Sequence, residues 1–198
     1  MSPRTSQQYV DIKESKRRLI LDTACTLFAH HGFYDTSISM ITKAAGISKG
    51  SIYNYFESKE QLLKSLVLDG LNQFDKHFDS NNDGVLTHAE FESYIDEYFS
   101  LLDKNREFWK LYFAIIIQPP VLKILEKEMQ EISAPMAKVL YNYFKSNDYS
   151  DPMAEMEFFS AALSGIAIKY LNAPEFFHLD KLKKKIFSLY PNKKKSEK

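Results

Sequence analysis

Polar side chains suited to contacting DNA gather between residues 36 and 59. Lys49 can donate to guanine acceptors in the major groove, and Asn54 can pair with adenine. Gly50 has no side chain, so the backbone around it could come close to the bases, and Ser51 shares this exposed side. Hydroxyl or ammonium donors suited to phosphate oxygens are carried by Thr36, Ser37, Ser48, Tyr53, Tyr55 and Lys59. Phosphate contacts of this kind would fix the register on a duplex without specifying its sequence.

Two short helices separated by a tight turn would position these side chains. Ser37, with Thr36 before it, can cap a helix that ends at Gly46, and Ser48 can cap a second short helix through Phe56. Two such helices joined by about three residues containing a glycine are typical of a helix-turn-helix. The second helix would then lie in the major groove of DNA. For Tyr53 and Tyr55, packing between helices is the alternative to phosphate contact.

A longer stretch of the chain resembles a known family. Residues 17–67 include "LFAHHGF", "TSISMITKAAGISKGSIYNYF" and "SKEQLL", in that order. This run is similar to the DNA-binding domain of the TetR family of bacterial transcriptional regulators. The resemblance implies that the polar residues named above, from Thr36 to Lys59, occupy DNA-contacting positions, whereas Ala45, Ile47, Ile52 and Phe56 are core.

Residues 79–90 form a separate motif that the TetR resemblance does not require. They fit the twelve-residue EF-hand calcium loop, D-x-[DN]-x-[DN]-G-x5-E, with Gly84 at the sharp turn. Oxygen ligands for calcium would come from Asp79, Asn81, Asp83, the Val85 carbonyl, Thr87 and Glu90. Calcium prefers such all-oxygen sites. The alternative is an Asn/Asp/Gly turn between two helices, which the same residues favour.

The segment 91–170 is rich in aromatic residues. In a helical bundle, this composition can line an apolar pocket for a small molecule. The candidate pocket walls are Trp109, Tyr112, Phe113 and Tyr141. The alternative for each of them is an aromatic core. No charged residue indicates a ligand class.

The C-terminal helices predict a dimer interface. Residues 153–171 are apolar on two faces, of which only one is needed for the subunit's own core. Phe158, Ala162 and Gly165 lie on one stripe, and Leu182 and Ile186 continue it on the next helix. Two such helices from each subunit would form a four-helix interface. The alternative is that these residues fill a monomer core.

Composition limits the remaining possibilities. Lys and Arg total 26, as do Asp and Glu, so the formal net charge is zero and positive charge for DNA must be local. Cys25 is the only cysteine, which excludes an intramolecular disulfide, and its apolar neighbours predict a buried thiol. The chain has no apolar stretch like a signal peptide and no run near 18 apolar residues. We therefore expect a soluble cytoplasmic protein without a membrane partner.

The predicted fold is all-α. An N-terminal three-helix helix-turn-helix domain is followed by a C-terminal helical bundle for ligand binding and dimerisation. We expect a flexible basic arm at 1–14, the DNA-binding domain at 15–60, the helical domain at 61–190 and a disordered lysine-rich tail at 191–198. Further helices are predicted over 58–77, 88–104, 106–118, 121–147, 152–172 and 176–190, and Pro135 should kink or break its helix.

The predicted function is that of a TetR-like regulator, and we expect it to act as a repressor. It would bind a palindromic double-stranded operator as a homodimer and be released by an apolar small-molecule effector, with no required cofactor. The first alternative is a calcium-binding or calcium-modulated protein acting through residues 79–90. The second is an enzyme, but the sequence lacks a Ser/His/Asp order, a nucleophile elbow, a phosphate loop and a zinc motif.

Overall fold

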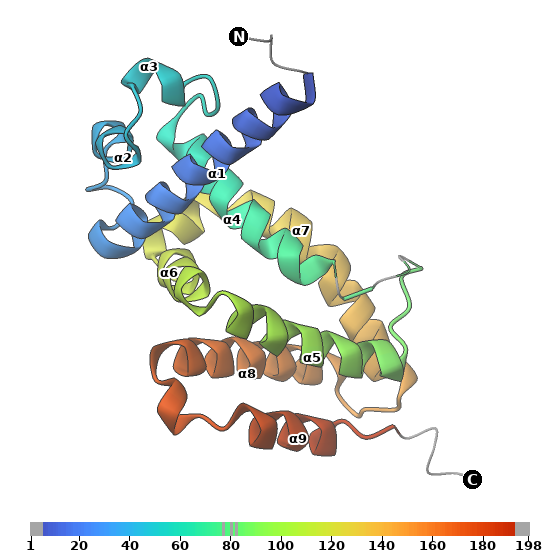
Figure 1. The fold of residues 1–198 in the computed structure, drawn as a ribbon. Coiled ribbons are helices and arrows are strands. Elements are labelled where there is room, and N and C mark those ends of the chain that lie inside the picture. The colour runs from blue at the N-terminus through green and yellow to red at the C-terminus, as the bar shows by residue number, and fades with distance from the viewer. Residues whose placement is uncertain (1–5, 77, 80, 82, 193–198) are drawn as a thin grey trace. The chain divides into compact units, whose positions relative to one another are not determined.

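The computed structural model describes residues 6–76, 78–79, 81 and 83–192, and all regular secondary structure in those ranges is helical (Figure 1). The helices are α1 (Ser6–His31), α2 (Ile38–Ala45), α3 (Lys49–Ile52), α4 (Lys59–Asp75), α5 (His88–Lys104), α6 (Arg106–Ile116), α7 (Pro119–Ser146), α8 (Pro152–Asn172), the 3-10 turn η1 (Pro174–Phe176) and α9 (Leu179–Leu189). The all-helical prediction is confirmed.

The chain divides into two compact units. The first contains residues 1–70 and 111–125, and the second contains residues 71–110 and 126–198. Helices α4, α6 and α7 each contribute residues to both units. The division therefore does not fall at a single point along the chain.

The first unit is built on one face of α1. Its apolar residues Ile20, Ala24 and Phe28 are almost completely buried, as are Ile41 of α2 and Ile52 of α3. Burying such side chains is the main favourable contribution to packing these short helices. Cys25 is free and buried in the same core, which confirms the prediction for its thiol.

Helix α1 begins earlier than the sequence predicted. The predicted flexible arm, 1–14, falls partly outside the described residues, but Ser6–Glu14 are helical. Tyr9 and Val10 are exposed, so this part has no apolar stripe from which a helix could be predicted. Local interactions support it instead, since the Gln7 amide donates to the Asp11 carboxylate one turn later.

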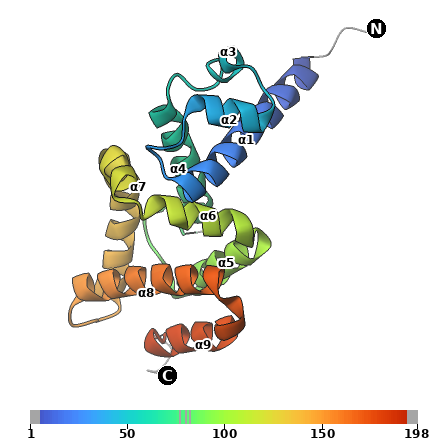
Figure 2. The same cartoon turned by 90° about the vertical axis from the view of Figure 1, so that its left-hand side faces the viewer.

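The second unit has an aromatic core. Helices α5, α8 and α9 lie side by side (Figures 1 and 2). The Phe91 ring packs against Tyr143 at 4.6 Å and Phe159 at 4.9 Å between centroids, and Phe144 packs against Tyr190 at 5.2 Å. Aromatic pairs at these separations stabilise a core beyond the effect of their buried area.

Some of the prolines lie at helix boundaries, and others lie inside or between helices. Pro119 opens α7 and Pro152 opens α8, where a missing N–H costs nothing. Pro174 lies in η1, so α9 starts only at Leu179. Pro135 does not break its helix, because α7 continues through it to Ser146.

Within the described ranges, no single helix is both long and apolar enough to cross a bilayer. Helices α6 and α7 reach that length and apolarity only together, as a bent pair.

Candidate nucleic-acid interface and ligand cavity

The helix-turn-helix is fixed by caps that the sequence predicts. The Ser37 hydroxyl accepts from the Met40 amide at 3.2 Å and so caps α2. Gly46 ends α2 in the left-handed conformation, with φ of 66°, which few residues other than glycine adopt. The Ser48 hydroxyl accepts from the Ser51 amide at 3.2 Å and caps α3. These caps define where the short helix begins.

Helix α3 presents polar groups to solvent. Lys49, Gly50 and Asn54 are exposed, and Tyr53 is 48% exposed (Figure 2 shows α3 beside α2). On the opposite side, Ile52 is fully buried and anchors the helix. Ser37, Ser48, Ser51 and Tyr55 are exposed or half-buried around this surface. We call the exposed set Lys49, Gly50, Tyr53 and Asn54 the recognition surface.

Two of the predicted DNA contacts serve the protein's own turn instead. The Thr36 side chain is fully buried, and its hydroxyl donates to the carbonyls of Leu27 and Gly32. The Lys59 ammonium donates to the carbonyls of Phe33 and Thr36, both at 2.8 Å. It also lies 4.4 Å from the centroid of the Phe33 ring. Neither donor is free for a phosphate in this arrangement.

An exposed tyrosine outside the predicted set of contacts precedes the helix-turn-helix. Tyr34, in the turn before α2, is 69% exposed. Its position two residues before Thr36, in a segment without helical periodicity, gave no reason to choose it. Its phenol is a donor of the kind that phosphate oxygens accept.

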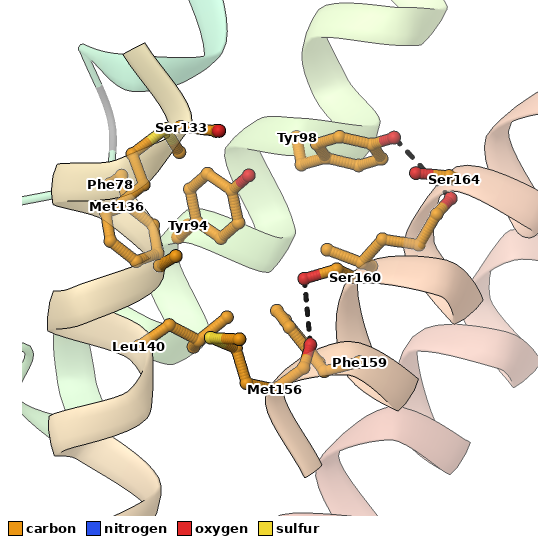
Figure 3. Close-up of a pocket in the computed structure, with 12 residues that line it drawn as sticks. Phe78, Tyr94, Tyr98, Ser133, Met136, Leu140, Met156, Phe159, Ser160 and Ser164 are labelled. Atoms are coloured by element: carbon orange, nitrogen blue, oxygen red, sulfur yellow. Dashed lines mark hydrogen bonds between the residues drawn. The ribbon is translucent and has the colours of Figure 1, made fainter. Parts of the chain in front are cut away.

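The second unit contains an apolar cavity of about 230 Å³ between α5, α7 and α8 (Figure 3). Its lining residues are Phe78, Tyr94, Tyr98, Ser133, Met136, Ala137, Leu140, Met156, Phe159, Ser160, Leu163 and Ser164. The aromatic rings and leucines are buried, whereas the three serines are exposed. The cavity thus has an apolar floor and a hydroxyl rim.

The four predicted pocket residues do not line this cavity. Trp109, Tyr112 and Phe113 are buried in cores, and Tyr141 is half-buried elsewhere on α7. Burial raises the pKa of the Tyr112 phenol, and neighbouring Cys25 adds to the effect. The neutral phenol donates to the Val67 carbonyl at 2.9 Å. The burial of Trp109, Tyr112 and Phe113 fits the alternative of an aromatic core, and Tyr141 stays a prediction.

The actual lining follows a spacing that the sequence does show. Tyr94 and Tyr98 are four residues apart on α5, and Met156, Ser160 and Ser164 repeat every four residues on α8. Residues four apart share a helix face. Aromatic content alone does not identify these positions, because half of the residues that line the cavity are serine, methionine or alanine.

The loop 79–90 is held by its own hydrogen bonds. The Asp79 carboxylate accepts from the Gly84 amide at 2.8 Å, and the Asp83 carboxylate accepts from the Val85 amide at 2.8 Å. Glu90 accepts from both the amide and the hydroxyl of Thr87, which completes the capping box of α5. Among the described residues, no three His, Cys, Asp or Glu side chains converge on a common point. The six predicted ligands are therefore not gathered into a closed cation site.

The predicted interface residues differ in exposure. Phe158 is 58% exposed, and Ala162, Gly165 and Leu182 are half-buried. A Cβ added at Gly165 would meet no atom within 4 Å. Ile186 is 5% exposed and belongs to its own subunit's core, because α9 turns this residue inward.

The fold and the exposed helix α3 define an all-helical protein with an N-terminal helix-turn-helix. The family model for bacterial regulatory proteins of the tetR family matches residues 20–66. Within those residues, the chain is similar to the DNA-binding domain of that family.

Known proteins are similar to this chain over about half of its length. The fatty acid metabolism regulator protein of Bacillus subtilis is 34% identical over 91 residues, which are 46% of this chain and 47% of that protein. The chain spans about half the length of the first curated relatives it matches.

Two solved structures share the fold over most of both chains. One is the transcriptional regulator FadR from Bacillus subtilis in complex with stearoyl-CoA, with a TM-score of 0.68, 20% identity, and coverage of 87% of this chain and 96% of that one. The other is the SmeT–triclosan complex, with a TM-score of 0.70, 18% identity, and coverage of 90% and 93%.

Proposed function

We propose that this protein is a transcriptional regulator that binds double-stranded DNA as a homodimer in the cytoplasm and is released by a small-molecule effector. The observation that carries the proposal is the recognition surface: Lys49 and Gly50 of the capped helix α3, its C-cap Tyr53 and Asn54 in the next turn are exposed, whereas Ile52 on the same helix is buried. Lys49 and Asn54 have the chemistry to distinguish bases, and Tyr53 suits phosphate. Repression is the mode of control we favour.

Dimerisation is part of this proposal. A short recognition helix makes few contacts, whereas two copies about 34–36 Å apart match the two halves of a palindromic operator. Phe158 on α8 and Leu189 on α9 are exposed apolar residues beside a hollow of about 340 Å³. Covering them with a second copy would remove apolar surface from water. Ala162, Gly165 and Leu182 belong to the same proposed interface.

A ligand bound in the cavity could change the position of the DNA-binding helices through α4. The Tyr98 ring lines the cavity and packs 4.9 Å from Phe74, near the end of α4. Helix α4 begins at Lys59, directly after the helix-turn-helix. A ligand that prefers one position of Tyr98 therefore shifts α4, and the effect is limited to the difference in affinity between the two positions. The stearoyl-CoA and triclosan complexes support a small-molecule effector.

Selection of duplexes from a random pool tests DNA binding directly. We expect the wild-type protein to enrich a palindrome. Asn54→Ala or Lys49→Ala should lose about 1–3 kcal/mol of discrimination at one position in each half-site. Lys138→Ala, an exposed lysine of α7, is the matched control and should keep the wild-type preference. Failure to retain any duplex at low salt would overturn the proposal.

A second proposal concerns the loop 79–90, which we suggest binds calcium. All six positions that supply ligands in an EF-hand are among the described residues and carry oxygen donors. In the described part of the chain, the Asp79 Oδ1 atom is buried and has no hydrogen-bond partner, which is costly for a carboxylate oxygen. A cation would satisfy it once Glu90 turned from its cap towards the loop.

Thermal unfolding with calcium or with a chelator tests this site. Calcium should raise the unfolding midpoint of the wild type, because a ligand that binds the folded state stabilises it. Glu90→Gln keeps an oxygen for the Thr87 cap but lacks the charged bidentate ligand, so it should lose most of the shift. Glu97→Gln, on the same helix, should keep it. An unchanged wild-type midpoint would show that the loop is only a turn.

A further inference from the structure

The size of the cavity limits what it can hold. Its volume is about 230 Å³, below the roughly 300–1,000 Å³ of pockets that enclose drug-sized ligands. An apolar cavity of about 150 Å³ is known to hold one benzene molecule. The cavity itself therefore has room for a single ring with a short substituent, and most of a long chain with a large head group would lie outside it.

The floor of the cavity favours a ring. Phe159 on α8 and Tyr94 on α5 line it from different helices, and Phe78 lines it beside Met136 (Figure 3). Aromatic faces pair well with a ligand ring. The thioethers of Met136 and Met156 add flexible, polarisable contacts that suit aromatic edges.

The lining also excludes charge. None of the described residues that line the cavity is Asp, Glu, Lys, Arg or His. An ionised ligand group would lose its hydration there without an opposite charge to compensate, and that cost is large. A neutral ligand is the only kind that the floor can bury.

The rim prefers a ligand that donates a hydrogen bond. The Ser160 hydroxyl already donates its proton to the Met156 carbonyl at 2.8 Å (Figure 3). Its oxygen can then only accept from a ligand, because a hydroxyl has one proton and two lone pairs. Ser164, one turn further along α8, lies at the same exposed rim.

We infer that the cavity takes an uncharged, single-ring molecule bearing a hydroxyl donor, that is, a small phenol. This inference rests on the proposed function only for the role of the ligand as effector. The binding itself depends on the cavity alone. Long-chain acyl thioesters are excluded by size and charge.

Calorimetric titration of the full chain tests the ligand class with three single-ring probes of related shape and one long-chain acyl thioester. We expect 4-propylphenol to bind at least tenfold more tightly than 4-propylbenzoate, and palmitoyl-CoA not to bind in the cavity. Ser160→Ala should weaken 4-propylphenol by about 2- to 12-fold, the loss expected for one hydrogen bond. Binding of the uncharged propylbenzene, which has no donor, should not change in that variant.

Two further variants locate the binding. Ala137→Leu fills the cavity from α7 and should abolish phenol binding, whereas Ala161→Leu, at an exposed position of α8 outside the lining, should not. The inference is overturned if no phenol binds, if the benzoate binds as tightly, or if Ala137→Leu blocks palmitoyl-CoA. Thermal unfolding of Ala137→Leu without ligand separates a filled cavity from a failed fold.

Release of DNA is measured separately. If 4-propylphenol binds the protein but does not release it from its selected duplex, the ligand class is supported and the effector role is contradicted. If the protein binds no duplex, the proposed function fails while the phenol titration still decides the ligand class.

Discussion

Single residues in the helix-turn-helix divide into those that face outward and those that hold the turn. Asn54 and Lys49 are exposed, whereas Thr36 and Lys59 give their donors to backbone carbonyls. A buried carbonyl without a donor is costly, so these two side chains stabilise the chain between α1 and α2.

Lys59→Met tests this division. The variant removes donors to the carbonyls of Phe33, Tyr34 and Thr36, so the free energy of unfolding should fall by about 1–3 kcal/mol. Urea denaturation measures this change. Lys43→Met, an exposed lysine of α2, should alter stability by less than about 0.5 kcal/mol. A stable Lys59→Met protein whose DNA affinity becomes less salt-dependent would instead indicate a phosphate contact.

Sequence alone separates these roles only in part. The caps Ser37, Gly46 and Ser48 were predictable because capping depends on neighbours a few residues away. The role of Lys59 was not, since its acceptors lie 23 to 26 residues earlier. A lysine beside a helix start has the same sequence signature whether it contacts a phosphate or a carbonyl.

Among the elements, α4 and α6 meet at an unusually close approach within the first unit. A Cβ added to Gly70 would lie 2.2 Å from Cε2 of Tyr112. The Tyr112 hydroxyl reaches back to the Val67 carbonyl on α4. The absence of a side chain at Gly70 lets the ring lie flat against this helix, although glycine is otherwise unfavourable there.

Gly70→Ala should therefore destabilise the protein. We expect a loss of about 1–3 kcal/mol, typical of overpacking, in place of the gain that alanine brings to an open helix position. In the Tyr112→Leu background the same change should cost much less, because the clashing ring is absent. Chemical denaturation of the four proteins in this cycle gives the coupling, and additive effects would contradict the close contact.

Most elements could be predicted from periodicity and caps, as α5 and α8 show at both ends. The exception is the start of α1, where Tyr9 and Val10 are exposed and no buried face marks the helix. Helix α7 is a second exception. The sequence shows that Pro135 removes a backbone hydrogen bond, but it does not show the packing that keeps the helix continuous.

At the scale of the whole molecule, the exposed apolar residues of α8 and α9 form the interface of the proposed dimer. Phe158→Arg should dissociate the proposed dimer, because a charge would have to be buried against the second copy. Phe176→Arg is the matched control, since Phe176 is even more exposed, at 77%, and lies outside the proposed interface. Sedimentation of both variants at equal concentration decides the matter, and a monomeric wild type would contradict the interface.

The cavity is the feature that sequence could predict least. Its walls come from α5, α7, α8 and Phe78, which lie far apart in the chain. Each wall residue has an ordinary identity for a helix face, so only the packing of three helices shows which faces enclose a space. The predicted residues Trp109 and Tyr112 instead fill cores, as large aromatic side chains commonly do.

The proline inside α7 has a consequence for how selective that space is. Pro135 has no N–H to give to the preceding turn, and it lies within the stretch that supplies Ser133, Met136 and Ala137 to the wall. A helical turn that lacks one backbone hydrogen bond needs less free energy to bend than an intact turn. The α7 wall of the proposed phenol site can therefore adjust to differences between ring substituents, within the limit that its volume of about 230 Å³ sets.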